Sequence, residues 1–311
     1  MKKWMILLAG LFILLMNGCR PAAIELQSKT LDDVPRILVL SAFAPETSAL
    51  LRRADQKTIY SVANRQFTTA RLGGKEVVLA ESGVSMVNAA MTTQAAVDHF
   101  RISAVVFSGI AGGINPDLNI GDVVIPAEWG QHLESVFARQ DGEQWDPGRF
   151  GSDFGNYGMM FPQPVDVPRL GSGGTSYDTI FWFQADPSML LAATTAASRV
   201  TLEQCWLVIN CLTNRPKVIP GGRAVSGPAF VDNAEYREWL YQNFQANAVD
   251  METAAAAQTA YVNGIPFIGF RSLSDLAGGS AGSNELLVFG NLAAENAARV
   301  VEEFLIVWNG P

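Results

Sequence analysis

The order of apolar and polar residues predicts strands that alternate with helices along most of the chain. Short apolar runs typical of buried strands lie at residues 37–42, 77–80, 104–108, 123–126, 224–226 and 266–271. Apolar residues recur at helical spacing in segments 86–100, 235–244, 252–262 and 292–308. This alternation predicts an α/β domain in which helices cover a mixed or largely parallel sheet.

One long segment breaks the alternation. Residues 130–187 are rich in Gly, Pro, Asp and aromatic residues and show no sustained period. A stretch of this length inside a compact domain is more often functional or partner-facing than idle. We therefore predict a long irregular insertion within the domain.

The N-terminus has the pattern of a targeting segment. Lys2 and Lys3 precede an unbroken apolar run at 5–16. That run is too short to cross a bilayer of roughly 30 Å as a helix. Residues 1–18 are therefore predicted to be a signal peptide that is removed from the mature protein.

The residues after the apolar run resemble the cleavage site of a bacterial lipoprotein. A small residue, Gly18, precedes Cys19, which would carry the lipid, and ordinary secretion is the alternative. Arg20 follows the cysteine in place of aspartate, which predicts an outer-membrane location facing the periplasm. We expect residues 19–35 to form a tether and residues 36–311 to form the domain.

The charge balance excludes a class of partner. The chain has 22 Lys plus Arg and 30 Asp plus Glu, so loss of Lys2 and Lys3 leaves 20 basic residues and a formal charge of −10. A polyanion-binding protein needs the opposite sign. The balance argues against nucleic acid and suits a neutral small molecule.

Two cysteines remain in the mature domain besides Cys19. Cys205 and Cys211 are six positions apart, and an oxidising compartment would allow them to pair. The pattern predicts a disulfide that closes a small loop, with two free buried thiols as the alternative.

Three segments place polar or small residues directly after predicted strands, where ligands bind in open α/β sheets. Segment 41–46 ends on Glu46, which the residues alone also allow as an ordinary helix-opening charge. Segments 81–84 and 108–113 are small-residue loops whose glycines let backbone approach a ligand closely. Taken separately, these loops are equally consistent with tight turns.

Two further segments bring carboxylates to predicted strand ends. Residues 249–252 place Glu252 at the start of a helix, and residues 271–275 end an apolar strand on Asp275. A carboxylate at the end of a buried strand is costly unless a partner or a function uses it. The alternatives are helix-dipole complementarity for Glu252 and a helix N-cap for Asp275.

In their order and spacing, these segments resemble the superfamily of purine nucleoside phosphorylases and methylthioadenosine/S-adenosylhomocysteine nucleosidases. The resemblance covers residues 36–126 and 220–306. Segments 222–233 and 274–279 look closest to the branch that includes plant bark storage proteins. The resemblance implies a single-domain, three-layer α/β/α fold with a twisted mixed central sheet.

The resemblance also implies a role for each site residue. Glu46 would activate the attacking water, Glu252 would hold the ribose hydroxyls, and Asp275 would donate to N7 of the purine. The expected substrate-binding residues are Ser274, which orients Asp275, Phe230, which stacks on the base, Val231 beside it, Met251 beneath the sugar, and Ser82 and Gly109 in loops lining the pocket.

The chemistry of the bond agrees with these roles. Breaking an N-glycosidic bond builds positive charge on the sugar and negative charge on the base, so an acid suits the base and a carboxylate with water suits the sugar. Asp275 ends an apolar strand and should keep a proton, whereas Glu46 should see more water and remain ionised. The prediction is hydrolysis of a purine nucleoside, adenosine or methylthioadenosine-like, with water as co-substrate and without a metal or cofactor.

Three departures from the resemblance keep alternatives open. Pro228 stands where the nucleosidases commonly carry aspartate, and the 130–187 insertion is longer than its counterpart. Phosphorylases use arginine to hold phosphate, yet residues 37–51 and 102–125 contain none. A purine nucleoside phosphorylase and a non-catalytic nucleoside-binding or storage protein are the alternatives. A homo-oligomer is expected from the resemblance, with the membrane contacted only through the lipid.

Overall fold

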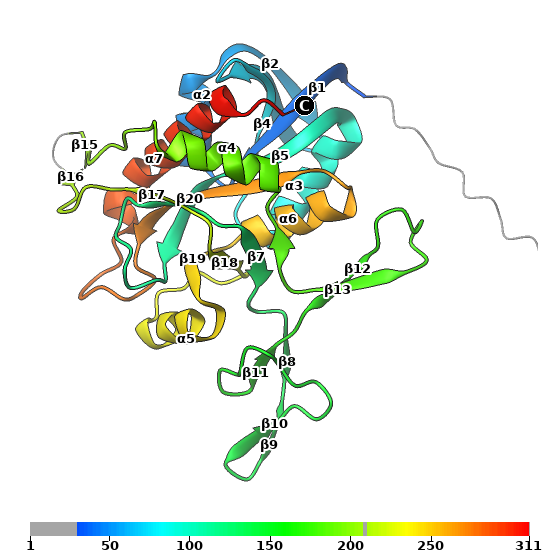
Figure 1. Cartoon of the computed structure of the whole chain (residues 1–311), viewed down its shortest axis with the longest axis vertical. Helices are drawn as coiled ribbons and strands as arrows, with labels where there is room; N and C mark the ends of the chain where they lie inside the picture. The colour runs from blue at the N-terminus through cyan, green and yellow to red at the C-terminus, as the bar shows by residue number, and fades with distance from the viewer. Residues whose placement is uncertain (1–29, 208–209, 311) are drawn as a thin grey trace, which may run out of the picture.

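The computed structural model describes residues 30–207 and 210–310, and its central element is a mixed sheet (Figure 1). The strands of this sheet are β1 (Asp32–Ser41), β2 (Asp55–Val62), β3 (Arg65–Leu72), β4 (Lys75–Glu81), β5 (Phe100–Gly113), β6 (Val123–Ile125), β7 (Glu128–Gln131), β14 (Phe183–Gln184), β17 (Val218–Pro220), β18 (Arg223–Ser226), β19 (Ala246–Asp250) and β20 (Phe267–Asp275). They follow the order β14-β7-β18-β19-β5-β1-β4-β3-β2, while β20 pairs with β5 and β6, and β6 pairs with β17.

Helices cover both faces of the sheet. The helices are α2 (Ala44–Arg53), α3 (Met86–His99), α4 (Pro187–Ala197), α5 (Ala234–Phe244), α6 (Thr253–Val262) and α7 (Leu286–Val307). Successive side chains of a strand point to opposite faces. Ile37 and Val39 of β1 accordingly pack in the core formed with α2, α4 and α7, whereas Leu38 and Leu40 pack in the core formed with α3 and α6. The predicted three-layer α/β fold is confirmed.

The strand directions determine where a site can form. β1 pairs in parallel with β4 and β5, and β20 pairs in parallel with β5, so the carboxyl ends of these four strands meet at one edge. β19 runs antiparallel to the last residues of β5 and returns the chain to this edge at Asp250. This edge carries the candidate site, as expected for an α/β sheet.

The predicted strands and helices all exist, but some regular elements were not anticipated. Helix α2 begins directly after β1, so Glu46 lies in a first helical turn rather than in an open turn. The hairpin of β2 and β3 was not predicted, nor were α4 and β19. The last helix begins at Leu286, six residues before the predicted start at residue 292.

The segment 130–187 is less irregular than predicted. Its ends belong to the central sheet through β7 and β14, which pair with each other. Between them, short strands form two-stranded pairs: β8 (Ser135–Phe137) with β11 (Met160–Pro162), β9 (Arg139–Asp141) with β10 (Gln144–Asp146), and β12 (Val165–Pro168) with β13 (Tyr177–Ile180). Figure 1 shows these hairpins reaching away from the body of the molecule. Hydrophobic periodicity missed them because strands of three or four residues are too short to show a period.

Aromatic side chains join this insertion to α5. Phe154 and Phe181 of the insertion lie 5.0 Å and 5.6 Å, centroid to centroid, from Phe244 at the end of α5. Tyr157 meets Tyr236 in the first turn of α5 edge-on at 4.8 Å. Since α5 follows the segment that carries Phe230 and Val231, the insertion supports one wall of the candidate site from behind.

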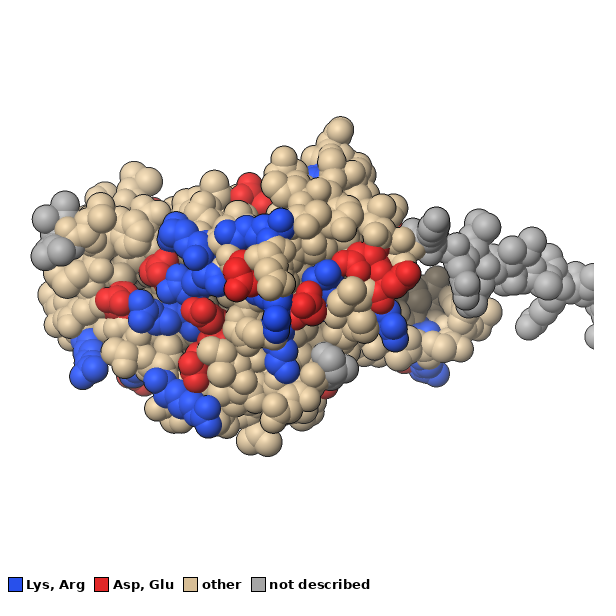
Figure 2. Space-filling view, turned by 90° about the horizontal axis from the view of Figure 1, so that it is seen from above, with Lys and Arg blue, Asp and Glu red and all other residues tan. Residues whose placement is uncertain are grey.

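The end of the molecule opposite the insertion carries charges of both signs. Figure 2 shows Lys and Arg intermixed with Asp and Glu on this face. Arg36 near the start of β1 pairs with Asp32 and with Glu76 of β4 at 2.6 and 2.7 Å. At the end of α2, Arg53 pairs with Glu295 at 2.5 Å. Both arginines are thus paired with carboxylates, and the face in Figure 2 carries mixed charge rather than a single basic patch.

The sequence predicted a signal peptide with a lipidated Cys19 and a disulfide between Cys205 and Cys211. The signal peptide and Cys19 lie outside the described residues. Cys205 and Cys211 face each other across the short pair β15 (Cys205–Trp206) and β16 (Asn210–Cys211), and their sulfurs are bonded as a disulfide. Within residues 30–207 and 210–310, no helix combines the length and apolar character needed to span a membrane.

Candidate active site

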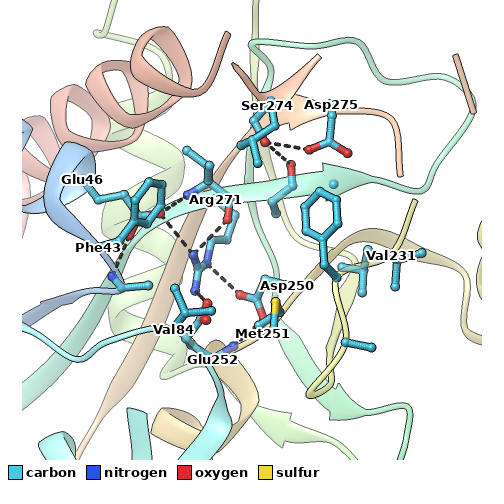
Figure 3. A pocket seen from close by; sticks show the side chains of 18 residues that line it. Phe43, Glu46, Val84, Val231, Asp250, Met251, Glu252, Arg271, Ser274 and Asp275 are labelled. Atoms are coloured by element: carbon cyan, nitrogen blue, oxygen red, sulfur yellow. Dashed lines mark hydrogen bonds and ion pairs between the residues drawn. The ribbon is translucent and has the colours of Figure 1, made fainter. Parts of the chain in front are cut away.

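A cavity of about 210 Å³ opens at the carboxyl edge of the sheet (Figure 3). Residues far apart in the sequence line it together, and they come from the ends of β1, β5, β19 and β20, from the starts of α2, α6 and α7, and from the loops that hold Val84 and residues 229–231. The lining residues are Ala42, Phe43, Glu46, Val84, Ile110, Ala111, Gly112, Ala229, Phe230, Val231, Val249, Asp250, Met251, Glu252, Arg271, Ser274, Asp275 and Leu286.

A fully buried guanidinium lies at the centre of the polar part of the cavity. Arg271 of β20 pairs with Asp250 at 2.7 Å, with Glu252 at 3.2 Å and with Glu46 at 3.6 Å. Its remaining contacts are the hydroxyl of Thr253, the carbonyl of Ile110 and the face of the Phe107 ring. Burial opposes its charge, but the three carboxylates together raise the pKa of Arg271 above its ordinary value. The guanidinium therefore stays protonated and holds three acids within one small volume.

Glu46 is held rigidly by the ends of two strands. The backbone N–H of Ala42 donates to its Oε2 at 2.6 Å, and the N–H of Ile110 donates to its Oε1 at 2.7 Å. Only 2% of Glu46 is exposed, so the expectation that it would see more water is wrong. The helix that begins at Ala44 turns the side chain inward, under β5. Gly109 makes this possible, because a Cβ at that position would overlap both Arg271 Nη1 and Glu46 Oε1.

Burial also changes the expected protonation of Glu46. Burial raises the pKa of Glu46 to about 7, although Arg271 and the two backbone donors act in the opposite direction. At neutral pH the carboxyl is therefore poised between its two protonation states, in the range that suits a general base.

Glu252 lies at the N-cap of α6 but does not cap that helix with its side chain. Its Oε1 accepts the backbone N–H of Ser85 at 2.8 Å, and its Oε2 accepts from Arg271 at 3.2 Å. Ser85 has φ of 94°, a conformation that costs energy for a residue with a Cβ and is frequent at functional sites. Burial raises the pKa of Glu252, and Arg271 opposes that shift. The arrangement fits a carboxylate that receives a ligand rather than one that serves the helix.

Asp275 and Ser274 form a second polar group on another side of the cavity, away from Glu46 and Glu252 (Figure 3). The Ser274 hydroxyl donates to Asp275 Oδ2 at 2.8 Å, and the N–H of Ala277 donates to Oδ1 at 2.8 Å. Burial raises the pKa of Asp275, while these donors and Asn284 lower it. The next helix begins eleven residues later, at Leu286, so Asp275 is not the N-cap that the sequence also allowed. The raised pKa that was expected for Asp275 agrees with its burial in the structure.

Apolar side chains complete the cavity between the two polar groups. Phe230 is 54% exposed at the rim, and Val231 and Met251 lie in the wall, where Figure 3 shows Met251 beside Asp250 and Glu252. Ser82 does not line the cavity, because it is buried beneath the loop with its hydroxyl donating to the carbonyl of Gly83. Gly109 contributes space for Glu46 and Arg271 rather than a surface for a ligand.

Sequence reasoning assigned no role to Arg271 or Asp250. A usable signal was present, because an arginine within a strand otherwise composed of apolar and small residues must find carboxylates in the interior. The partner acids, however, come from separate segments of the chain, and pairing them with Arg271 requires the fold. Phe43, Val84 and Ile110 lie in segments that were predicted to line the site, although no role was given to them, whereas Leu286 at the start of α7 was not anticipated.

Comparison with known proteins places this geometry in a family. The family model described as the phosphorylase superfamily matches residues 36–306. A 5′-methylthioadenosine/S-adenosylhomocysteine nucleosidase from Geobacillus kaustophilus is 31% identical over 270 residues, covering 86% of this chain and 96% of the relative. The protein of the same name from Bacillus licheniformis is 30% identical over 244 residues, covering 78% of this chain and 87% of the relative.

A solved structure agrees with the sequence relatives. The 5′-methylthioadenosine/S-adenosylhomocysteine nucleosidase from Neisseria meningitidis, in complex with methylthio-immucillin-A, superimposes with a TM-score of 0.65 at 27% identity. The match covers 88% of this chain and 99% of that chain. The fold, the order of the site segments and the family model agree, and the chain therefore belongs to the phosphorylase superfamily.

Proposed function

We propose that the protein is a purine nucleosidase that hydrolyses the N-glycosidic bond of a 5′-methylthioadenosine-like nucleoside to free base and sugar. One observation carries the proposal: Glu46 and Glu252 lie on one side of a small cavity and Asp275 lies on another (Figure 3). An N-glycosidic hydrolase needs carboxylates where positive charge develops on the sugar and a proton donor where negative charge develops on the base. The names of the relatives support the same reaction class.

The bond changes follow from the placement of the three acids. Asp275, whose pKa burial raises, would hydrogen-bond to N7 of the purine and transfer its proton there as the bond between N9 and C1′ breaks, so that the electron pair left on the base is neutralised. Glu46 would take a proton from the attacking water, whose oxygen forms the new bond to C1′. Glu252 would accept hydrogen bonds from the ribose 2′ and 3′ hydroxyls, and Phe230 would stack on the base. The products are the neutral purine and the free sugar.

Hydrolysis is favoured over phosphorolysis by the surroundings of the one cation in the cavity. Among the described lining residues, Arg271 is the sole lysine or arginine, and Asp250, Glu252 and Glu46 already surround it. A phosphate dianion placed there would face three carboxyl groups, at a cost that one shared guanidinium does not offset. The cavity therefore suits a neutral nucleoside and water.

A product assay tests the reaction class. The mature protein is incubated with 5′-methylthioadenosine, adenosine and inosine, each with and without inorganic phosphate, and the products are separated by chromatography. We expect adenine and 5-methylthioribose from 5′-methylthioadenosine at the same rate in both buffers. A sugar 1-phosphate formed only in the phosphate buffer would overturn the proposal in favour of a phosphorylase.

The finer affiliation and the location are part of the same proposal. Segments 222–233 and 274–279 support a position near the bark storage protein branch of the family. The basic start, the short apolar run and Gly18 before Cys19 support a lipoprotein of the outer membrane that faces the periplasm.

We also propose that the protein forms a homo-oligomer. Val84 lines the cavity and is partly exposed, and Val87 and Met91 of α3 extend an exposed apolar surface from it. Contiguous apolar surface beside a site commonly marks an interface. Light scattering after size exclusion measures the mass in solution, and a mass equal to that of one chain would contradict the proposal.

A further inference from the structure

Asp250 lines the cavity, but its carboxylate is bonded to several polar groups of the protein. Its Oδ2 pairs with Arg271 Nε at 2.7 Å and accepts from the Thr253 hydroxyl, and its Oδ1 accepts from the Ser226 hydroxyl. The backbone N–H groups of Glu252 and Thr253 also donate to Oδ1, each at 3.2 Å. Both carboxylate oxygens of Asp250 are thus bonded to groups of the protein. We therefore look for its role in its effect on these neighbours, above all Arg271, rather than in contact with a ligand.

The partners of Asp250 fix it against movement. Ser226 lies opposite Asp250 in the register of β18 and β19, and its hydroxyl also accepts the N–H of Ala254 at the start of α6. Thr253, in the first turn of α6, bridges Asp250 and Arg271 through its hydroxyl. Two strands and a helix therefore hold this carboxylate in place, which is the arrangement expected of a group that positions another charge.

The charged groups that face Arg271 can be named from each described element packed against it. They are Glu46 of α2, Asp250 of β19 and Glu252 at the start of α6, and the other contacts of the guanidinium are neutral. One positive charge is therefore shared among three carboxyl groups. Asp250 makes the shortest of these ion pairs and approaches through Nε, which leaves Nη1 toward Glu46 and Nη2 toward Glu252.

We propose that Asp250 is a positioning residue that fixes the orientation of Arg271 and is its main ion-pair partner. The guanidinium then orients Glu46 and Glu252 through weaker ion pairs. The inference deepens the proposed nucleosidase function and rests on it. A carboxylate fully paired with a guanidinium is a poor base, because its pKa falls well below neutral. A carboxylate beside a guanidinium already neutralised by Asp250 keeps its basicity and its place.

The test is a pH profile, because a purely structural role would lower rates without moving it. Asp250→Asn keeps the shape and removes the charge, which leaves Arg271 to Glu46 and Glu252 alone. With 5′-methylthioadenosine as substrate, we expect the acidic limb of kcat/KM to move down by about one pH unit or more relative to the wild type. Asp250→Glu keeps the charge, and Ser226→Ala removes one holding hydroxyl without changing any charge, so both should retain the wild-type limb even where their rates fall.

Two further measurements keep the result interpretable. Thermal unfolding verifies that each variant is folded, and if Asp250→Asn does not fold, Asp250→Ser removes the same charge with less volume. Carbon-13 NMR of glutamate-labelled protein, assigned with Glu46→Gln, follows the titration of Glu46 directly without substrate. A Glu46 titration and an acidic limb that are unchanged in the charge-removing variant would overturn the inference. Absence of hydrolysis by the wild type with a shifted Glu46 titration would overturn the proposed function alone.

Discussion

Glu46 shows how a single residue can be both a buried structural group and a reactive one. Its oxygens accept two backbone N–H groups, so the carboxylate is held without a lysine or arginine bound tightly to it. Burial makes the charged form costly, and Arg271 at 3.6 Å makes it possible. These opposing effects leave the pKa of Glu46 at about 7, whereas an exposed glutamate would be fully ionised at that pH.

The first prediction concerns the pH dependence of catalysis. Because Glu46 must be ionised to accept a proton from water and burial raises its pKa to about 7, kcat/KM should fall as the pH drops through 7. Glu46→Gln should lower kcat by about 10² to 10⁴ above pH 7, the usual cost of losing a general base, and this gap should narrow as the pH falls and wild-type Glu46 becomes protonated. Steady-state rates from pH 5 to 9 measure both effects. Undiminished turnover by Glu46→Gln would remove Glu46 as the base even if hydrolysis were established.

The second prediction concerns the pH dependence of folding stability, which follows from the same raised pKa of Glu46. A glutamate whose folded-state pKa is raised from 4.5 to about 7 binds a proton more readily when folded, so folding stability declines as the pH rises through this interval. Glu46→Gln removes that dependence. The unfolding temperature of the variant relative to the wild type should therefore be higher at pH 8 than at pH 5, which is the advantage expected from removing a costly buried charge. Calorimetry at the two pH values checks the sign, and an equal or greater advantage at pH 5 would contradict it.

The third prediction concerns the selectivity of Glu252 for the ribose. A carboxylate that accepts from two adjacent hydroxyls loses one hydrogen bond with a 2′-deoxy substrate, and hydrogen bonds to charged groups contribute about 1.5 to 3 kcal/mol. We expect kcat/KM for 2′-deoxyadenosine to be about ten- to a hundredfold below that for adenosine. In Glu252→Gln the ratio of the two rates should approach one. Equal rates on both nucleosides by the wild type would assign the ribose contact elsewhere.

At the scale of elements, the site depends on how closely β5 and β20 approach the start of α2, where Glu46 lies. The two strands pair in parallel, with Gly109 opposite Arg271, and the glycine leaves the space that Arg271 and Glu46 fill. Any side chain there would drive the two charged groups apart. Gly109 therefore allows the close approach of Arg271 and Glu46 on which the electrostatics of the site depend.

The fourth prediction follows from this packing. Gly109→Ala places a Cβ in overlap with Arg271 Nη1 and Glu46 Oε1, so turnover should fall by at least tenfold and thermal stability should fall with it. Gly151→Ala is the matched control, because nothing lies within 4 Å of a Cβ at that exposed position of the insertion. Assay and thermal unfolding of both variants make the comparison. A Gly109→Ala protein as active as Gly151→Ala would show that the cluster tolerates displacement.

The elements that sequence reasoning predicted and missed differ for a physical reason. Buried parallel strands such as β1 and β5 are continuous apolar runs, and the apolar stripe of α7 spans many turns, so composition alone reveals them. The β2 strand is largely exposed and polar, and helix α2 follows β1 with only two residues between them, so neither stands out. Glu46, Glu252 and Asp275 received their roles from the family resemblance, because their positions at strand ends and helix starts left ordinary alternatives open. Arg271, which pairs with Glu46 and Glu252, was missed because its contacts are long-range.

At the scale of the whole molecule, the site and the start of the domain lie at opposite edges of the sheet. β1 begins at Asp32 at the amino edge, and it ends beside Ala42 at the cavity. A tether before the described residues would therefore join the domain on the side where β1 begins, away from the cavity. A protein attached to a membrane through such a tether would present its cavity to the aqueous compartment, where a small nucleoside can diffuse to it.

The last prediction tests that attachment. If Cys19 carries the lipid, full-length protein expressed in a Gram-negative bacterium should sediment with membranes, and Cys19→Ala should shift it to the soluble or unprocessed pool because no acyl chain remains. Intact mass of the membrane form should exceed that of the chain from residue 19 by the mass of a diacylglyceryl group or more. Nucleosidase activity of washed vesicles should match that of a soluble protein beginning at residue 30, since the cavity lies at the far edge of the sheet. Cys205→Ala is the matched control, for it removes a cysteine of the domain and should leave the protein in the membrane fraction. Membrane retention of Cys19→Ala at the wild-type level would overturn the lipoprotein assignment while leaving the proposed chemistry of the cavity untouched.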